Sequence, residues 1–286
     1  MDSLSRTPLY GMPLAGAGTG DVESLRSYLQ RLAAAHHLNP SMFSRLIFKT
    51  RENRYEGVLH LNGVGAVASR FTELVQANTG VDVRAASMAR FGAVIPAPYL
   101  VRQDHSVYCP RCVVSESQTG RAHSRLVWEL EFVTACPRHG LKLQVRKCGA
   151  LPCDQLESAQ RPRLPDVCRY CGSIGLRCQE IFEPASVTAQ WTANQAAELV
   201  SLSDIEVRTL SLDKLRAGIA SAVRHRFDGQ PVKAARMAGL ARASVFTWLQ
   251  GDSRPALGAL FRFAIHAQAN VVGLFRGEFK IGRAHV

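Results

Sequence analysis

Residues 108–143 read YCPRCVVSESQTGRAHSRLVWELEFVTACPRHGLKL, and this stretch decides the fold that we expect. It contains Cys109-Pro-Arg-Cys112 and, after 23 intervening residues, Cys136-Pro-Arg-His139. Two residues between paired ligands allow each motif to direct two donor atoms at one centre, and a Cys3His set is a standard closed zinc site. The spacing therefore predicts that Cys109, Cys112, Cys136 and His139 bind a structural zinc ion.

The remaining cysteines suggest a second, less regular site. Cys168 and Cys171 form a clean C-x2-C pair, whereas four residues separate Cys148 from Cys153. Cys178 is left over and either replaces Cys153 or takes no part. In a reducing cytoplasm, eight cysteines favour metal ligation over disulfides. We therefore expect two zinc ions, the second bound by Cys148, Cys153, Cys168 and Cys171.

The segment between the first two motifs, Arg125–Val133, is expected to be a strand or a short helix. We judge the section around it to be too poor in apolar residues to fold unaided, so that zinc would fold it. A redox C-x2-C motif would follow a strand in a βαβ unit, and no such pattern is present. A catalytic zinc needs a vacant coordination position and a nearby acid or base, and nothing assigns Glu116 or Glu129 to that role. We expect no enzyme here.

Helical patterns precede the cysteine section. Apolar residues recur at three- and four-residue steps after Asp21, which suits the N-cap of a first helix. Asn39 and Pro40 predict the start of a second helix, so that the pair would form a helical hairpin or a helix-turn-helix. A third helix is expected from Gly65 to Asn78, ended by Gly80. Its expected apolar face is Val67, Phe71, Leu74 and Val75.

Residues 232–251, VKAARMAGLARASVFTWLQG, predict a second helix-turn-helix. Ala235 and Ala238 would face inward on the first helix, Gly239 would make the turn, and Val245, Trp248 and Leu249 would lie on the buried face of the second. That second helix would lie in the major groove of DNA. The expected DNA contacts are Lys233, Arg242, Ser244, Thr247, Gln250 and Arg254.

The charge of the chain supports a nucleic-acid partner. The chain has 286 residues, 47% of them hydrophobic, and a formal net charge of +12. Between Lys214 and Arg262 there are nine lysines and arginines against two aspartates. Such an excess suits phosphate neutralisation. The alternative is a helical bundle that stabilises the rest or docks a protein.

The chain lacks the patterns of a membrane or secreted protein. No stretch approaches the roughly 18 apolar residues of a membrane span, and the N-terminus does not resemble a signal peptide. We therefore expect a cytoplasmic, nucleoid-associated protein without a membrane partner. Ile281–Val286 back-translates to a common sequencing-adapter string, so we expect this tail to be non-native and the natural protein to extend further.

These patterns together predict a mainly α protein with a small zinc-stabilised α+β middle section that resembles a double zinc finger. The expected regions are an N-terminal helical region (1–105), a zinc-binding region (106–183), a linker with some helix (184–212), a C-terminal helix-turn-helix (213–280) and the suspected tail (281–286).

Three pieces of the chain resemble the TniQ family of transposition proteins. The run Glu23–Ala33 looks like their opening helix. The motifs Tyr108–Cys112, Arg125–Trp128 and Cys136–Leu143 then follow in the expected order, covering about residues 8–175 together with the flanking sequence. The resemblance implies the two zinc-ligand sets given above, although C-x4-C replaces the usual C-x2-C in the second. The C-terminal section separately resembles Cro/cI-type helix-turn-helix domains.

TniQ-type proteins act beside a transposase and an AAA+ ATPase of the TnsC/TniB type. The resemblance therefore implies a non-catalytic target-selection protein of a mobile genetic element. It would bind DNA or a targeting complex, which in some members is a CRISPR effector, and would recruit the ATPase. The chain has no G-x-x-x-x-G-K-[ST] loop, so ATP hydrolysis would belong to that partner.

Two other functions remain open on the residues alone. A stand-alone zinc-containing helix-turn-helix transcription regulator would use the same C-terminal helices to read an operator. A metal-dependent nuclease or hydrolase is the third reading, and it lacks an acidic cluster or an open metal site. Flanking transposase and ATPase genes would favour the transposition protein over the regulator.

Overall fold

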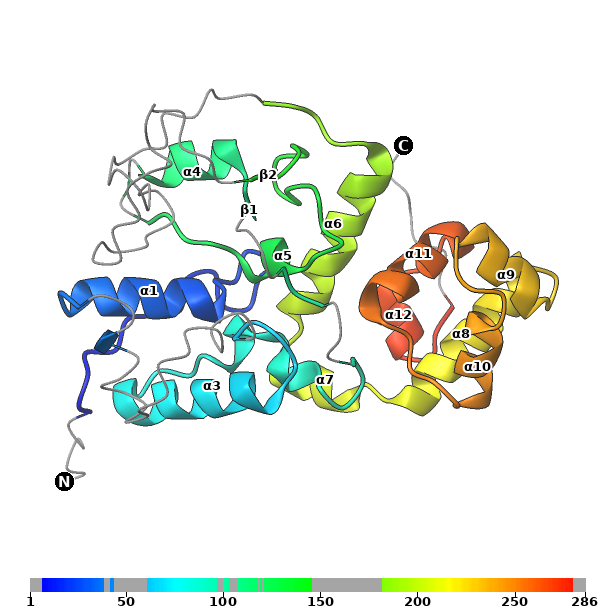
Figure 1. The fold of residues 1–286 in the computed structure, drawn as a ribbon, viewed down its shortest axis with the longest axis horizontal. Helices are drawn as coiled ribbons and strands as arrows, with labels where there is room; N and C mark the ends of the chain where they lie inside the picture. The colour runs from blue at the N-terminus through cyan, green and yellow to red at the C-terminus, as the bar shows by residue number, and fades with distance from the viewer. Residues whose placement is uncertain are drawn as a thin grey trace.

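The computed structural model describes residues 7–38, 42–43, 61–96, 100–102, 107–117, 119, 121–145 and 182–279. These parts of the chain are mainly helical, as the sequence predicts, with one short two-stranded sheet. Figure 1 shows a larger body built around α1, α3 and α6, and a C-terminal helical bundle beside it. Among the described residues, no helix combines the length and apolar character needed to span a membrane.

The N-terminal region packs α1 (Leu25–Ala35) and α3 (Ala66–Thr79) around a small apolar core. Gly80 ends α3 with a left-handed φ of 72°, as predicted. The buried face of α3 is rotated from the expected one, because Val67 is 43% exposed. The buried residues of α3 are Ala68, Thr72, Val75 and Thr79. Most of the predicted second helix lies outside the described residues, and so does the predicted hairpin.

The first helix begins later than the sequence indicated. Its N-cap is Ser24, whose hydroxyl accepts a hydrogen bond from the Ser27 amide at 3.2 Å. Glu23 instead forms a β-bridge with Arg125, which holds the chain extended before the helix. Asp21 is therefore not the cap; its carboxylate accepts a hydrogen bond from Arg125 at 2.6 Å.

The middle section is built from short elements. β1 (Val107–Tyr108) pairs antiparallel with β2 (Gln144–Val145), and α4 (Pro110–Ser117) and α5 (Leu126–Glu129) lie between them in the chain. The predicted strand or short helix in Arg125–Val133 is thus a one-turn helix. Two 3-10 turns, η2 (Arg84–Ala86) and η3 (Met88–Phe91), precede the section.

The described part of the middle section is not poor in apolar residues, which corrects the sequence-based judgement. The side chains around α5 are almost completely buried in the main core. They are Leu126, Val127, Trp128, Leu130 and Val133. The sequence argument failed because it considered the section alone, whereas α5 packs against α6 (Val187–Ser201), a helix that follows much later.

Residues 184–212, expected to be a linker with some helix, contain α6 and α7 (Asp204–Thr209). α6 buries Ala193, Ala196 and Leu199 and contacts both α5 and the C-terminal bundle. Ser203 caps α7 through a capping box with Glu206. The segment therefore forms part of the core, and its helix α6 packs against both the middle section and the C-terminal bundle.

The C-terminal bundle consists of α8 (Leu212–Arg226), α9 (Pro231–Met237), α10 (Ser244–Gln250), α11 (Leu257–Ala267) and α12 (Val271–Phe275). In Figure 1, α11 and α12 lie beside α6, and α9 and α10 lie on the other side of the bundle. The predicted inward positions hold, since Ala235, Ala238, Val245 and Trp248 are buried and Leu249 is partly buried.

The bundle is joined to the larger body by direct contacts. Phe132 packs against Phe261 of α11 with ring centroids 4.5 Å apart. The α6 side chain of Gln195 accepts a hydrogen bond from the Val271 amide at 2.8 Å, and Glu198 accepts one from Asn270 at 2.9 Å. The orientation of α9 and α10 relative to the middle section is thereby set by packing.

Candidate metal centre and nucleic-acid interface

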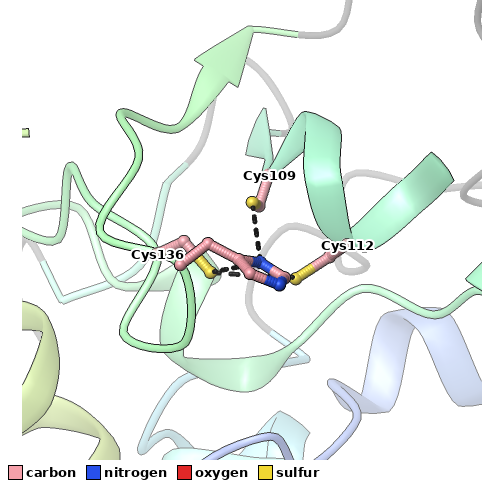
Figure 2. A group of neighbouring side chains, drawn as sticks. Cys109, Cys112 and Cys136 are labelled. Carbon is pink, nitrogen blue, oxygen red and sulfur yellow. Dashed lines mark hydrogen bonds between the residues drawn. The ribbon is translucent and has the colours of Figure 1, made fainter. Parts of the chain in front are cut away.

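Three cysteines and one histidine converge between α4 and the loop that precedes β2 (Figure 2). Cys109 and Cys112 lie at the start of α4, and Cys136 and His139 lie in a turn closed by the bridge between Ala135 and Lys142. The four donor atoms all lie within 4.8 Å of one another. The first predicted ligand set is thus brought together and can hold a metal ion such as zinc.

The distances from His139 to the three cysteines are close to those around a tetrahedral ion. The His139 Nδ1 atom lies 3.5 Å from the Cys109 sulfur, 3.2 Å from that of Cys112 and 3.8 Å from that of Cys136. The Cys112 and Cys136 sulfurs are 3.7 Å apart. Tetrahedral zinc with Zn–S bonds of about 2.3 Å and Zn–N bonds of about 2.0 Å places its ligand atoms about 3.5 to 3.8 Å from each other.

Backbone hydrogen bonds orient the side chains of the four Cys and His residues toward one another. Cys109 immediately precedes α4, and its carbonyl accepts a hydrogen bond from the Val113 amide at 3.1 Å. In the second turn the Gly140 amide donates to the Cys136 carbonyl at 3.0 Å, and Gly140 has a φ of 64°. A side chain at that position would be strained. From α6, Gln190 donates to the Pro137 carbonyl at 3.0 Å and fastens the turn to the core.

The three cysteine side chains are fully buried. Hydrogen bonds from the Cys112 and then the Cys136 thiol lower the pKa of Cys109 to about 3. The hydrogen bond to Cys109 correspondingly raises the pKa of Cys112. The cluster thus favours at least one thiolate, which is the form that binds metals.

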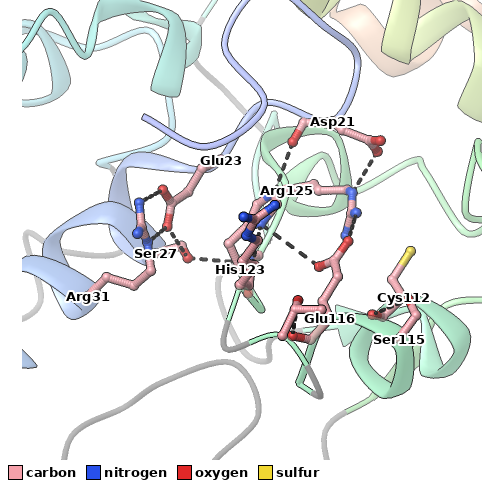
Figure 3. Close-up of polar contacts among 12 residues, drawn as sticks. Asp21, Glu23, Ser27, Arg31, Cys112, Ser115, Glu116, His123 and Arg125 are labelled. Carbon is pink, nitrogen blue, oxygen red and sulfur yellow. Dashed lines mark hydrogen bonds and ion pairs between the residues drawn. The ribbon is translucent and has the colours of Figure 1, made fainter. Parts of the chain in front are cut away.

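A buried arginine lies beside the candidate metal centre (Figure 3). Arg125 is 1% exposed, stacks over Trp128 at 4.6 Å and forms ion pairs with Asp21 and Glu116. Burial lowers its pKa, but its interactions with Cys112, Asp21 and Glu116 outweigh burial and raise it. Arg125 therefore stays charged and connects the residues before α1 to the helix that carries Cys112.

The two acids considered from the sequence are held in ion pairs. Glu116 binds Arg125 and lies 3.6 Å from Arg138, which belongs to the Cys136–His139 turn. Glu129 lies 3.6 Å from Arg26 and is buried. Both carboxylates thus balance arginine charges. The sequence analysis missed Asp21 and Glu116 as partners of Arg125, and the only local signal was the R-x-x-W motif.

The second predicted ligand set lies outside the described residues. It comprises Cys148, Cys153, Cys168 and Cys171, together with the alternative ligand Cys178.

The predicted DNA contacts lie on or next to α9 and α10, in differing surroundings. Arg242, Gln250 and Arg254 are exposed, and neither arginine forms an ion pair with a described residue. Lys233 is paired with Asp228 at 2.6 Å. Ser244 and Thr247 are half-buried. The Thr247 hydroxyl donates to the Ser244 carbonyl at 2.9 Å and lies 2.8 Å from the Ser253 hydroxyl.

Comparison with known proteins supports the resemblance for the N-terminal half. Residues 15–143 match the model of the TniQ family. No curated protein gives a significant match to the chain. The matched residues include Cys109, Cys112, Cys136 and His139. Residues 15–143 are thus similar to the TniQ family, and this match indicates a transposition-associated accessory protein.

Proposed function

We propose that the chain is a non-catalytic target-selection protein of a transposon, which binds DNA through its C-terminal bundle and recruits an AAA+ ATPase of the TnsC/TniB type. The closed Cys3His cluster within the TniQ-matching residues is the observation that carries this proposal. All four tetrahedral positions would be filled by protein atoms, which leaves no position for a substrate. Such an ion stabilises structure and performs no chemistry.

The metal part of the proposal assigns zinc to Cys109, Cys112, Cys136 and His139, and a second zinc to Cys148, Cys153, Cys168 and Cys171. Zinc content of the reduced protein, measured by inductively coupled plasma mass spectrometry, tests it. We expect Cys112→Ser to lose one zinc equivalent and Val114→Ala, an exposed neighbour on the same helix, to lose none. Equal zinc in both variants would disprove the first site.

The DNA part of the proposal rests on the location and charge of α9 and α10. These helices lie on the side of the bundle away from α6, so the described part of the larger body does not cover them (Figure 1). Arg242 and Arg254 are exposed and form no ion pair with a described residue, so both are available to phosphates. Residues 214–262 carry seven more positive than negative charges. Electrostatic binding of this kind weakens steeply with salt.

An electrophoretic mobility shift with the full chain tests DNA binding. We expect Arg242→Ala combined with Arg254→Ala to weaken binding at least tenfold at low salt and to reduce its salt dependence, because two phosphate contacts are lost. Arg138→Ala, an exposed arginine beside the metal centre, is the matched control and should bind like the wild type. Equal binding by all three proteins would exclude this surface.

The ATPase part of the proposal rests on the family match. We expect the cognate AAA+ ATPase to be retained by the immobilised chain in the presence of DNA, and transposition to be lost in the Cys112→Ser strain. Retention of a CRISPR effector or of the transposase itself would identify the other members of the complex. Failure to retain the ATPase with and without DNA would contradict the recruiting role.

A further inference from the structure

A phenylalanine is exposed in the centre of the outward face of α10. Phe246 is 52% exposed, whereas its neighbours Val245 and Trp248 are buried. Single exposed apolar residues are common on proteins, so exposure alone assigns no role. The position of Phe246 is more informative. Ala243 and Gln250, three residues before and four residues after it, are also exposed, which places all three on one stripe of the helix.

Thr247, which the sequence analysis predicted as a DNA contact, is less accessible than Phe246. Thr247 is half-buried, and its hydroxyl is engaged by the Ser244 carbonyl and by Ser253. Its only donor hydrogen is therefore used within the bundle. Phe246 and Gln250 project from the part of α10 that α6 and α11 do not cover. Arg242, which precedes them, forms no ion pair with a described residue.

We propose that Phe246 is a specificity-determining residue that packs against the C5-methyl group of a thymine in the major groove. This inference rests on the proposed DNA binding by α10. The thymine methyl is the apolar group that a base pair presents in the major groove, and phenylalanine and alanine side chains contact it. Positive charge around α10 favours DNA over an apolar protein partner as the occupant of this surface.

The neighbouring side chains fit the same reading. Gln250 offers an amide that pairs with adenine, and Arg242 offers a guanidinium for guanine or phosphate. Phe246 has no polar atom, so it can distinguish thymine from other bases only through shape and apolar contact. Removal of one thymine methyl group from the DNA should therefore weaken binding only through the lost contact with Phe246, and the contacts of the polar residues of the stripe should not change.

Deoxyuridine provides the test, because it differs from thymidine only by that methyl group. A duplex is first selected with the full chain from a pool of randomised duplexes. Each thymine of the selected duplex is then replaced by deoxyuridine, one at a time, and Kd is measured for the wild type, Phe246→Ala and Ile205→Ala. Ile205 is 77% exposed on α7 and serves as the matched loss of an exposed apolar side chain.

We expect one replacement to weaken wild-type binding about fourfold, the value for one apolar carbon removed from its contact. Phe246→Ala should bind the thymine duplex about tenfold more weakly and show no further loss with that deoxyuridine. Ile205→Ala should behave like the wild type. Circular dichroism melting should be unchanged in both variants.

Two outcomes would overturn the inference, and they are distinguishable. If a duplex is enriched but Phe246→Ala retains both wild-type affinity and the wild-type response to deoxyuridine, Phe246 does not read thymine, whereas DNA binding by the chain stands. If no duplex binds above the level of a scrambled competitor, the proposed DNA binding fails and this inference fails with it.

Discussion

Residues 107–145 contain short helices and a small sheet, residues 212–275 form a helical bundle, and different interactions stabilise the two regions. In the first region, four ligand atoms meet at one point next to the buried pair of Arg125 and Glu116. In the second, Phe227, Trp248 and Phe263 pack ring against ring without a titratable cluster. The first region thus depends on the charge and ligation state of a few atoms, and the second on buried apolar area.

Both regions pack against α6. α6 contacts α5 on the side of the metal centre and α11 and α12 on the side of the bundle. Gln190 fastens the metal-binding turn, and Gln195, about one and a half turns further on, fastens α12. We therefore expect that a substitution or metal loss that destabilises one region leaves most of the other region folded.

Removal of the metal should have the largest effect. Structural zinc contributes several kcal/mol to folding, so chelation or Cys112→Ser should lower the stability of the first region by about 5 kcal/mol or more. This corresponds to a fall in Tm of about 10 °C or more. Hydrogen exchange followed by mass spectrometry should show lost protection in 107–145 and retained protection in 212–275. Uniform loss over both would refute separate stabilisation.

Phe263→Ala should produce the reverse pattern. Phe263 is fully buried between Phe227 and Trp248, and truncation of such a residue costs about 4 kcal/mol. Urea unfolding would measure the loss, and zinc content should not change. Phe246→Ala removes the same atoms from an exposed site of the same bundle and should cost less than about 0.5 kcal/mol. Similar losses in both variants would mean that the packing described for the bundle is incorrect.

Arg125→Ala should lower stability by about 3 kcal/mol, since it leaves the largely buried Glu116 carboxylate without its main partner. The matched variant is Arg138→Ala, which removes a 53% exposed arginine at 3.6 Å from the same carboxylate. It should cost less than about 1 kcal/mol. Chemical denaturation of the zinc-loaded protein would measure the free energy of unfolding of each variant and so distinguish the two expected losses. A larger loss in Arg138→Ala would reverse the roles assigned to these arginines.

The glutamine pair on α6 should show the smallest and most local effects. Gln190→Ala and Gln195→Ala each remove one hydrogen bond to another segment, worth about 1 kcal/mol, and one exposed hydrogen bond within α6. Gln190→Ala should accelerate zinc release to a colorimetric chelator, and Gln195→Ala should increase exchange at the Val271 amide only. If both variants released zinc at the same altered rate, α6 would transmit strain between the regions.

Local patterns were predicted well from the sequence. The convergence of Cys109 with His139 follows from two short motifs, and the end of α3 follows from Gly80. Positions that depend on distant partners were not predicted. Asp21 suited an N-cap, but it binds Arg125, 104 residues away, and Ser24 caps α1 instead. The burial of Trp128 likewise depends on helices that lie far along the chain.

By itself, the sequence determined the convergence of the four Cys and His residues, the turn at Gly239, and the inward positions of Ala235 and Trp248, because each depends on short local motifs or periodicity. Only the tertiary structure decided that α6 packs against both regions, that Arg125 is buried between two carboxylates, and that Phe246 rather than Thr247 is the more exposed of the two. These features arise from packing between segments far apart in the chain, which no local periodicity encodes.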